Sequence, residues 1–528
     1  MLNGKRLSGW MALAVFATVG GAMAATAPAF AGIDVDKLTI GGEIRERYEF
    51  RTDTGFLDTN AAKANESAFS QRVRVDVGYK LTPDVSFFVQ AQDARIWGNE
   101  TVGAANLITG VSSANNSGTG LDLHQGFIQL NNVLIPGLSI KGGRQEITFG
   151  DQRLVGNFNW SQIGIAFDGV RVTYSTAPAD LDLFFARLYD PTTGVAAPAG
   201  LSTTGVIFPN GVNGLSAGSL TDDLYGAYLT LKPVKNWTIE PYYLLLKNTA
   251  ATAVTANVSG PQASDQTRST LGGRINGKQG GLDATVEADW QFGSISNSAI
   301  AAGNGVNVGA NPIQDLRINA EALAARIGYT FENVPMKPRL GFEFDYASGE
   351  KCVNGNLGAN GCPAAGTPGV GHFNTFDNLF PTNHDLYGAM DLQAWRNAVI
   401  YQGNFTIQPD AVSKLKFEFM EHRLASTTDN WYRSGQVAYV VTGPSNQAAS
   451  LGQELDVIYW RTFKEKFKLE LGFGHFFAGE IFKNNPGLTN GSGAVTTING
   501  LAVSTGTGLA ANQVVDQNWG YVMGSIKF

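Results

Sequence analysis

Cysteine, histidine and charge are all scarce in this chain. Its 528 residues include 2 Cys and 5 His, and only 16% are Asp, Glu, Lys or Arg. The formal net charge of -7 argues against a nucleic-acid partner, which usually requires a basic face. The 64 Gly residues have neither the period of collagen nor the Pro excess of disordered chains, and 11% of the residues are aromatic. We therefore expect a folded protein that does not bind nucleic acid.

Long apolar runs are also missing after residue 31. No later stretch approaches the roughly 18 consecutive apolar residues that a membrane-spanning helix needs. The apolar stretch at residues 10–19 follows Lys5 and Arg6 and is followed by Ala29-Phe30-Ala31. This order is typical of an export signal with its cleavage site. We predict that residues 1–31 are a cleaved signal peptide and that residues 32–528 form one domain. An uncleaved N-terminal anchor is the alternative, and the short apolar stretch disfavours it.

The two cysteines are a candidate disulfide. Cys352 and Cys362 lie in a Gly/Pro-rich segment, and they would close a loop in an oxidising compartment outside the cytoplasm. A metal site with His372 and His384 is the rival interpretation, but the tight spacing of such sites is missing. We expect neither a bound metal nor a cofactor.

Strict two-residue alternation of apolar and polar side chains recurs along the chain. In residues 282–291, Leu282, Val286 and Trp290 fall on one face and Asp283 and Glu287 on the other. Such alternation predicts a strand with one apolar and one polar face. About 18 segments show it, near residues 40–51, 69–79, 85–95, 122–130, 138–147, 166–174, 181–189, 223–231, 237–246, 268–276, 282–291, 318–330, 338–346, 394–405, 414–422, 453–461, 467–477 and 517–528. The parity of 181–189 and 394–405 is ambiguous, and Gly142-Gly143 is a candidate bulge.

The connections between these segments alternate in length. Turns such as 80–84, 232–236, 277–281 and 462–466 are short, and Gly/Asn/Ser/Thr-rich connections such as 190–222, 347–393 and 478–516 are long. Short periplasmic turns and long extracellular loops are typical of transmembrane barrels. Only a closed barrel satisfies its backbone hydrogen bonds in lipid. We therefore predict an all-β protein, a transmembrane antiparallel β-barrel of about 18 strands in the outer membrane of a Gram-negative-type bacterium.

The charged face of each strand is expected to turn towards the lumen, because a charge facing lipid is costly. The candidate lumen cations are Arg45, Arg47, Arg72, Arg74, Arg171, Arg274, Arg326 and Arg339. The candidate lumen anions are Glu43, Glu49, Asp76, Glu240, Asp283, Glu287, Asp289, Glu321, Glu343, Asp345, Glu418, Glu454, Asp456 and Glu470. These residues either set ion selectivity or form salt bridges that hold the wall together. Arg45, Arg47, Arg72 and Arg74 are expected to form a local electropositive strip.

Catalysis finds little support in the sequence. The five His are scattered, no G-x-S-x-G motif occurs, and strand alternation already explains the pair Glu287 and Asp289. We predict that the protein is not an enzyme.

Several strings resemble the alginate export family of bacterial outer-membrane proteins. They are Gly143-Arg-Gln-Glu146, Gly150-Asp-Gln-Arg-Leu-Val-Gly156 with Trp160, Phe167-Asp-Gly-Val-Arg171, Phe380-Pro-Thr-Asn-His384 with Tyr387, Asp391 and Trp395, and Gly474-His-Phe-Phe-Ala-Gly479. The resemblance implies a monomeric 18-stranded barrel that passes an anionic polysaccharide through an arginine-lined constriction.

The matching strings add pore-lining candidates, namely Arg144, Arg153, Arg171, Asp151 and Asp168. An Arg/Asp hydrogen-bond network of these residues would fold segment 148–165 against or into the barrel and narrow it. The alternative is that the strings only fix loop structure. In the same way, Asn383, His384 and Asp391 either touch substrate or order the 347–393 loop.

The sequence thus predicts a passive outer-membrane channel for small anions or for an anionic polysaccharide such as alginate, with outer-membrane lipid around it. A general diffusion porin is one rival. A structural barrel that sheaths a periplasmic partner or displays adhesive loops is another. A monomer is expected, with a trimer left open.

Overall fold

The computed structural model describes most of the chain after residue 33. The described residues are 34–52, 65–97, 105–106, 111–112, 121–189, 220–250, 266–296, 315–351, 372–434, 438–439, 448–484, 496–498, 501–503 and 516–528. The predicted signal peptide and both candidate disulfide cysteines, Cys352 and Cys362, lie outside them.

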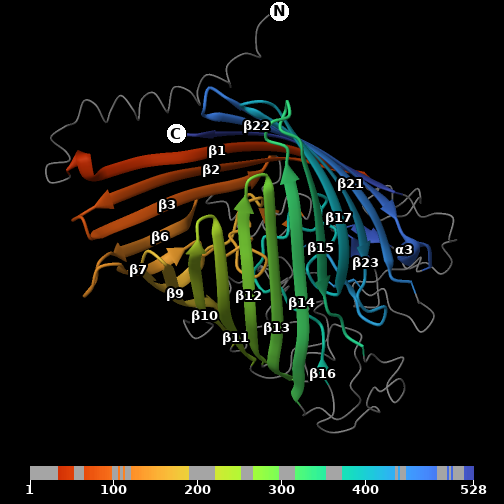
Figure 1. Ribbon diagram of the computed structural model, residues 1–528, viewed down its shortest axis with the longest axis horizontal. Coiled ribbons are helices and arrows are strands. Elements are labelled where there is room, and N and C mark those ends of the chain that lie inside the picture. Colours follow the sequence, from red (N-terminus) through yellow and green to blue (C-terminus); the bar gives the residue numbers. More distant parts are fainter. Residues whose placement is uncertain are drawn as a thin grey trace, which may run out of the picture.

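Eighteen antiparallel strands form a closed barrel, and each pairs with its neighbours in chain order (Figure 1). They are β1 (Leu38–Arg51), β2 (Glu66–Lys80), β3 (Val85–Ile96), β6 (Asp122–Leu130), β7 (Leu138–Gln145), β8 (Phe167–Ser175), β9 (Ala179–Tyr189), β10 (Leu220–Val234), β11 (Trp237–Ala250), β12 (Gln266–Gln279), β13 (Leu282–Ser296), β14 (Asp315–Thr330), β15 (Arg339–Ala347), β17 (Ala398–Asp410), β18 (Ser413–Arg423), β21 (Ser450–Phe463), β22 (Phe467–Ala478) and β25 (Gln517–Lys527).

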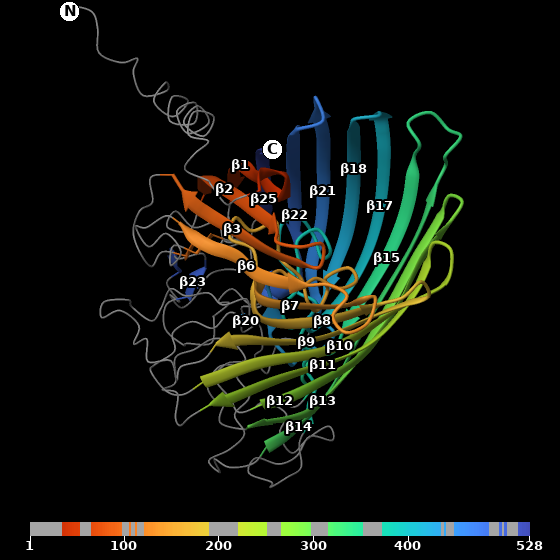
Figure 2. The same ribbon diagram turned by 90° about the vertical axis from the view of Figure 1, so that its left-hand side faces the viewer.

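The first and last strands close the wall. Tyr48 of β1 pairs with Phe69 of β2 on one side and with Val522 of β25 on the other. Figure 2 shows β1 and β25 side by side near the C terminus. Closure leaves no barrel strand with an unpaired edge, which is the condition for crossing lipid with strands.

The remaining elements are short. They are η2 (Val35–Lys37), β4 (Ala105–Asn106), β5 (Val111–Ser112), β16 (His372–Phe373), β19 (Trp431–Tyr432), β20 (Ala438–Tyr439), α3 (Glu480–Asn484), β23 (Thr496–Ile498) and β24 (Leu501–Val503). Of these, β16 joins the barrel sheet as a parallel partner of β14. Within the described part of the chain, no helix has the length and apolarity needed to span a membrane.

All 18 predicted segments overlap one barrel strand each, so the predicted fold class is confirmed. The largest boundary error is in β17, which begins four residues later than the predicted segment and ends at Asp410. The predicted bulge at Gly142-Gly143 is wrong, because pairing with both neighbouring strands runs through these residues without a shift. Gly143 instead has a φ of +128°, and its missing Cβ leaves room for the Gly126 carbonyl oxygen.

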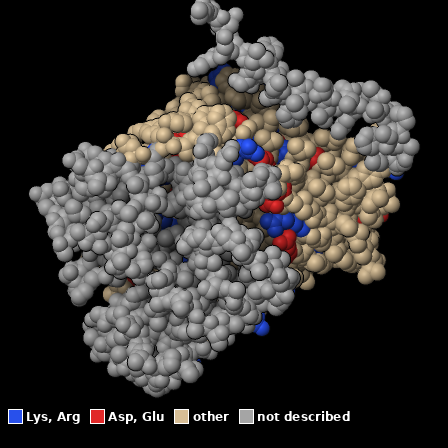
Figure 3. All heavy atoms as spheres, turned by 180° about the vertical axis from the view of Figure 1, so that it is seen from behind, with Lys and Arg blue, Asp and Glu red and all other residues tan. Residues whose placement is uncertain are grey.

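The two faces of the wall differ as predicted. Outward positions carry exposed apolar side chains such as Ile40, Val286 and Phe473, whereas inward arginines such as Arg47 and Arg72 are fully buried. In the view from behind, charged atoms gather mainly in a short band beside the grey residues, and the tan surface next to it has few (Figure 3). An apolar outer band of this kind suits contact with lipid.

Candidate functional site

Two loops run into the interior of the barrel. We call residues 146–166, between β7 and β8, the first inner segment, and residues 374–397, between β16 and β17, the second inner segment. At one end, the first inner segment accepts hydrogen bonds from inward arginines of β1 and β2. At the other end it contacts inward side chains of β12 to β15. These strands lie about half-way round the wall from β1 and β2, so the first inner segment crosses the lumen.

The two inner segments are joined by a short parallel bridge between Val155 and Phe380. The Phe380 amide donates to the Leu154 carbonyl oxygen at 2.9 Å, and the Gly156 amide donates to the Phe380 carbonyl oxygen at 2.8 Å. All three apolar side chains of this bridge are buried in one cluster. The two inner segments therefore form one unit inside the barrel.

At the arginine end, guanidinium groups hold the backbone of the first inner segment. Arg45 donates from Nη1 to the Asn159 carbonyl oxygen at 2.7 Å and from Nη2 to the Ser161 carbonyl oxygen at 2.8 Å. Arg72 donates from Nη1 to the same oxygens, at 3.3 and 3.1 Å. Both arginines are buried. They line the wall, as predicted, but the first inner segment covers them, so a solute in the lumen does not reach them in this conformation.

Trp160 is enclosed at the arginine end. The guanidinium carbon of Arg47 lies 4.0 Å from the centre of its ring. The His384 ring stacks on it with a centroid distance of 3.7 Å and an interplanar angle of 4°. His384 in turn contacts Asp391 through Nδ1 and Oδ2, at 3.1 Å. The wall and both inner segments thus meet at this indole ring.

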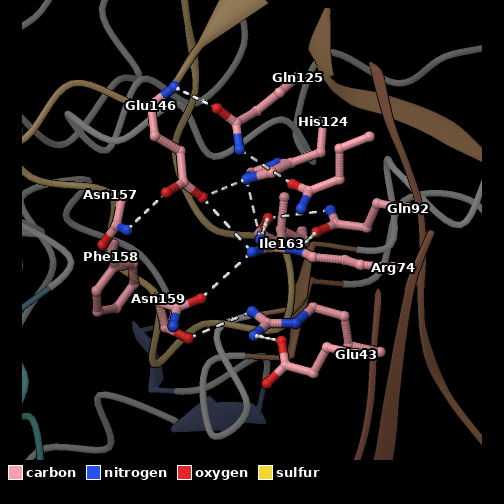
Figure 4. A network of polar contacts seen from close by, with 12 residues as sticks. Glu43, Arg74, Gln92, His124, Gln125, Glu146, Asn157, Phe158, Asn159 and Ile163 are labelled. Atoms are coloured by element: carbon pink, nitrogen blue, oxygen red, sulfur yellow. Dashed lines mark hydrogen bonds and ion pairs between the residues drawn. The ribbon is translucent and has the colours of Figure 1, made fainter. Parts of the chain in front are cut away.

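A polar network ties the start of the first inner segment to β2, β3 and β6 (Figure 4). Arg74 donates from Nε to Gln92 Oε1 at 2.7 Å, and its Nη2 lies 3.0 Å from His124 Nε2. That histidine nitrogen is 2.8 Å from Glu146 Oε1, and Asn157 donates to Glu146 Oε2 at 2.8 Å. Burial raises the pKa of Glu146, but the hydrogen bonds from His124 and Asn157 and the charge of Arg74 outweigh it and hold that pKa below its usual range.

At the acidic end the charges are reversed, because one buried guanidinium of the first inner segment faces several carboxylates. Arg153 donates from Nη1 to Asp345 Oδ1 and to the Tyr387 hydroxyl, both at 2.9 Å. Its Nη2 pairs with Glu343, and its Nε lies 3.8 Å from Glu287 Oε2. Arg153 and these acids are almost completely buried.

Asp151 complements this end with a carboxylate between two wall cations. Its Oδ1 accepts from Arg274 Nη2 at 2.7 Å, and its Oδ2 accepts from Arg326 Nη2 at 3.1 Å. Burial raises the pKa of Asp151, but Arg326, Arg274 and Arg153 hold it below its usual range. Gly150 makes this approach possible, because a Cβ there would lie 3.0 Å from Arg274 Cδ and φ is +53°.

Most predicted lumen residues on the strands face the interior. Their inward position follows from the strand register and from contacts with other inward side chains. The group comprises Arg45, Arg47, Arg72, Arg74, Arg171, Arg274, Arg326, Arg339, Glu43, Glu49, Asp76, Glu240, Asp283, Glu287, Asp289, Glu343, Asp345, Glu418, Glu454, Asp456 and Glu470. Several are already paired, as Arg339 is with Asp283 at 2.6 Å and Arg171 with Asp182 at 2.7 Å. Their role towards a solute stays a prediction.

Three predicted lumen residues lie on the outer face instead. Arg144 and Asp168 are cross-strand partners and form a 2.9 Å ion pair on the same face as the exposed Val170. The prediction that Arg144 and Asp168 face the lumen was wrong. It was taken from the sequence strings that resemble the family and not from the alternation of side chains along each strand. Glu321 shares the outward parity of Leu323, whereas Arg326 has the opposite parity and points inward. A regular strand cannot turn residues five positions apart to the same face.

Four residues of the site were not predicted from the sequence to face the lumen or to contact a distant segment. Lys141 is the inward cross-strand partner of Arg171, and the alternation of β7 would have revealed it without the assumed bulge. Glu146, Trp160 and Tyr387 occur in the family strings, but their contacts join segments far apart in the chain. No local signal predicts such contacts.

Asn383 and its neighbours act within the second inner segment. The Asn383 Oδ1 accepts from Asn378 Nδ2 at 2.7 Å, and its Nδ2 donates to the Ser434 carbonyl oxygen. These contacts order the loop. Across the described residues, no group of three or more His, Cys, Asp or Glu is arranged to hold a metal ion.

A closed barrel of 18 strands with an apolar outer face, charged inner wall and folded-in loops defines an outer-membrane β-barrel channel. More specifically, the chain belongs to the alginate export family, whose model matches residues 36–495. Its location is the outer membrane of a Gram-negative bacterium.

Solved structures of Pseudomonas aeruginosa proteins share the fold at low sequence identity. OccK8 (OprE) is 11% identical with a TM-score of 0.50, and the alignment covers 93% of this chain and 98% of that one. OpdK, solved with vanillate, is 10% identical with a TM-score of 0.50, and the alignment covers 93% of this chain and 99% of that one. No curated protein matches the chain.

Proposed function

We propose that this barrel passes carboxylate-bearing anions, with an acidic polysaccharide such as alginate as the candidate polymer, by passive diffusion and without chemistry at a bound cofactor. The two inner segments would narrow the path, so that solutes pass between them and the exposed part of the inner wall.

The observation that carries this proposal is an undercompensated pair of cations on β7 and β8. Lys141 and Arg171 are direct cross-strand partners on the inner face. Arg171 donates from Nε to Asp182 Oδ1 at 2.7 Å, and its side chain is 24% exposed. The Lys141 ammonium lies 4.5 Å from the Phe127 ring centre and has no hydrogen bond or ion pair with a described residue. Lys141 and Arg171 thus share the single carboxylate of Asp182, at a place on the inner wall that is open to solvent.

This pair differs from the inner arginines of β1, β2 and β15. The arginines of β1 and β2 are covered by the first inner segment, and Arg339 is held by Asp283 and by Asn404, whose Oδ1 lies 2.7 Å from Nη1. A guanidinium beside an ammonium offers several donors to a carboxylate. Anions are therefore expected to interact with Lys141 and Arg171 in preference to the buried strip.

Membership of the alginate export family supports a uronate polymer as the substrate. A general diffusion porin remains the rival, since the inner wall carries acids as well as bases. The rival predicts weak selectivity between small anions and cations and no block by the polymer. A barrel that only sheaths a partner predicts no conductance.

The test is the reversal potential of the full mature protein in a planar bilayer under a salt gradient, with alginate oligomers added as blocker. We expect anion selectivity and block by the oligomers, both weakened in Lys141→Gln. Arg339→Gln is the matched control, because it removes an inner cation that is already paired, and its effect should be smaller. Equal effects of the two substitutions, or no selectivity in the unaltered protein, would overturn the proposal.

A further inference from the structure

A row of polar side chains crosses the outer wall at the ends of β7 to β14 that the long connections join. Cross-strand pairing, continued by β16, places these residues side by side in this outer polar row: Arg144, Asp168, Arg187, Asp223, Lys247, Thr267, Ser294, Arg317 and His372. The strands of its second half, β11 to β14, are neighbours in the wall (Figure 1). Because long connections are extracellular in such barrels, the row lies on the side of the outer leaflet.

Aromatic side chains lie next to this row, on the side of the membrane centre. Phe185 and Tyr225 are cross-strand partners whose ring centroids are 5.2 Å apart. Phe292 stacks on Trp290 at 4.6 Å, and both Tyr225 and Trp290 are exposed on the outer face. Aromatic rows of this kind mark the interface between membrane and water in barrels. The outer polar row therefore lies at the depth of the lipid headgroups.

The first half of the row, on β7 to β10, is neutralised internally. Arg144 pairs with Asp168 at 2.9 Å. Arg187 donates to Asp223 from Nε at 2.9 Å and from Nη2 at 3.2 Å. Each of these two arginines thus has a carboxylate of its own, and this half offers little net charge to a ligand.

The second half, on β11 to β14, is cationic. Lys247 and Arg317 are exposed, and neither side chain has a hydrogen bond or an ion pair with a described residue. The strands that carry Thr267 and Ser294 lie between them. Asp223 is the cross-strand neighbour of Lys247, but its carboxylate is already taken up by the first half of the row. Two cations without a carboxylate of their own therefore flank two hydroxyl groups.

The spacing and chemistry of these side chains suit a phosphorylated sugar. Neighbouring strands lie about 4.8 Å apart, so Lys247 and Arg317, three strands apart, are separated by about 14 Å. A guanidinium binds phosphate through two parallel hydrogen bonds, and an ammonium binds it as a point charge. Towards the membrane centre, Leu271 and Trp290 are 52% and 48% exposed and present an apolar surface to acyl chains. Cations above an apolar wall match a lipid with an anionic headgroup.

We propose that Lys247, Thr267, Ser294 and Arg317 form a binding site for a phosphorylated glycolipid of the outer leaflet. Each cation binds a phosphate group, the hydroxyl groups between them bind oxygens of the headgroup, and the acyl chains lie on the apolar wall. This wall favours a lipid over free phosphate, because free phosphate has no acyl chains to place there. Basic residues at a membrane surface each add to the binding of anionic lipid.

This site lies on the outer wall, and it stands independently of the proposed anion path through the lumen.

The test measures lipid binding to the full mature protein in detergent by native mass spectrometry. The probes are diphosphorylated lipid A and the same lipid after removal of its phosphates. The unaltered protein should bind the phosphorylated form at least about tenfold more tightly, a comparison that needs no variant. The double variant Lys247→Gln with Arg317→Gln should lose this preference. The double variant Lys247→Arg with Arg317→Lys keeps both charges and should retain most of it.

Lys235→Gln with Lys464→Gln is the matched control, because it removes two exposed cations from short turns at the opposite end of the barrel. Its affinity for lipid A should equal that of the unaltered protein. Folding of each variant is checked by its heat-modifiable migration. Equal binding of the two lipid forms by the unaltered protein would overturn the proposal, and so would an equal loss in the control. Displacement of lipid A by inorganic phosphate at equal concentration would show a site for free phosphate instead.

Discussion

The two ends of the first inner segment are held in opposite ways. At the arginine end, the wall supplies the charge, and the segment offers neutral carbonyl oxygens at residues 159 and 161. At the acidic end, the segment supplies Arg153, and the wall supplies Glu343 and Asp345. The first arrangement spreads several donors over several acceptors. The second gathers several carboxylates around one cation.

This difference indicates which end of the first inner segment a single substitution disrupts more. Arg45 and Arg72 donate to the same two carbonyl oxygens, so either can still hold the backbone when the other is lost. Arg153 has no equivalent second donor among the described residues, since Arg326 approaches Glu343 only to 3.9 Å. Removing one partner of a buried ion pair leaves an uncompensated charge, which is the costly case.

The largest effect is expected for Arg153→Gln. Loss of the guanidinium leaves Glu343 and Asp345 buried without their nearest cation, and the free energy of unfolding should fall by about 3–5 kcal/mol. Urea titration of the refolded barrel, followed by tryptophan fluorescence, measures it. Open-channel noise should also rise as the segment loosens.

Arg144→Gln is the control for that comparison. Arg144 belongs to the string Gly143-Arg-Gln-Glu146 that resembles the family, but it pairs with Asp168 at the loop ends of β7 and β8. Loss of an exposed ion pair at such a place costs about 0–1 kcal/mol. If the two arginine variants were equally destabilised, the acidic end would not be the stronger anchor.

Acidification should have the next largest effect, and it should weaken the attachment of the first inner segment at both of its ends. The pKa values of Asp151 and Glu146 are held below their usual range by the neighbouring cations and hydrogen bonds. A lowered pKa in the folded state means that the ionised group stabilises the fold above its ordinary pKa of about 4, and that this contribution is lost as the pH falls through the lowered value.

Single-channel conductance should therefore stay constant from about pH 8 to about pH 5 and become noisy only below about pH 4. In Asp151→Asn the noise should already be present at neutral pH, because Arg274 and Arg326 lose a charged acceptor worth about 1–3 kcal/mol. A transition between about pH 7 and about pH 5 would show that groups other than these carboxylates hold the segment.

The smallest effect is expected for Arg45→Gln. The shared acceptors should limit the loss to about 1 kcal/mol, well below a single unshared charged hydrogen bond. The double variant with Arg72→Gln should lose more than the sum of the single changes, because the remaining donor is then removed. Urea titration of the three variants measures the free energy of unfolding. If each arginine held its own part of the segment, the loss in the double variant would instead equal the sum of the two single losses.

The strands could be predicted from the sequence, and part of the site could not. Period-two alternation in residues 282–291 gives β13 and the inward direction of Glu287 without knowledge of the fold, because successive side chains of a strand point to opposite faces. Trp160 shows the opposite case. It occurs in a matching string, but only the folded chain brings its ring against Arg47 of β1 and His384 of the second inner segment.

The all-β class, the closed barrel, a count of about 18 strands and the apolar outer face follow from the sequence alone, because backbone groups in lipid must all be paired and side chains alternate along a strand. Only the folded chain shows that residues 146–166 cross the lumen, that Arg45 and Arg72 are covered, and that Lys141 remains accessible. These facts depend on which strands lie across the barrel from each other and on how two distant loops fit together, and no periodicity along the chain encodes either.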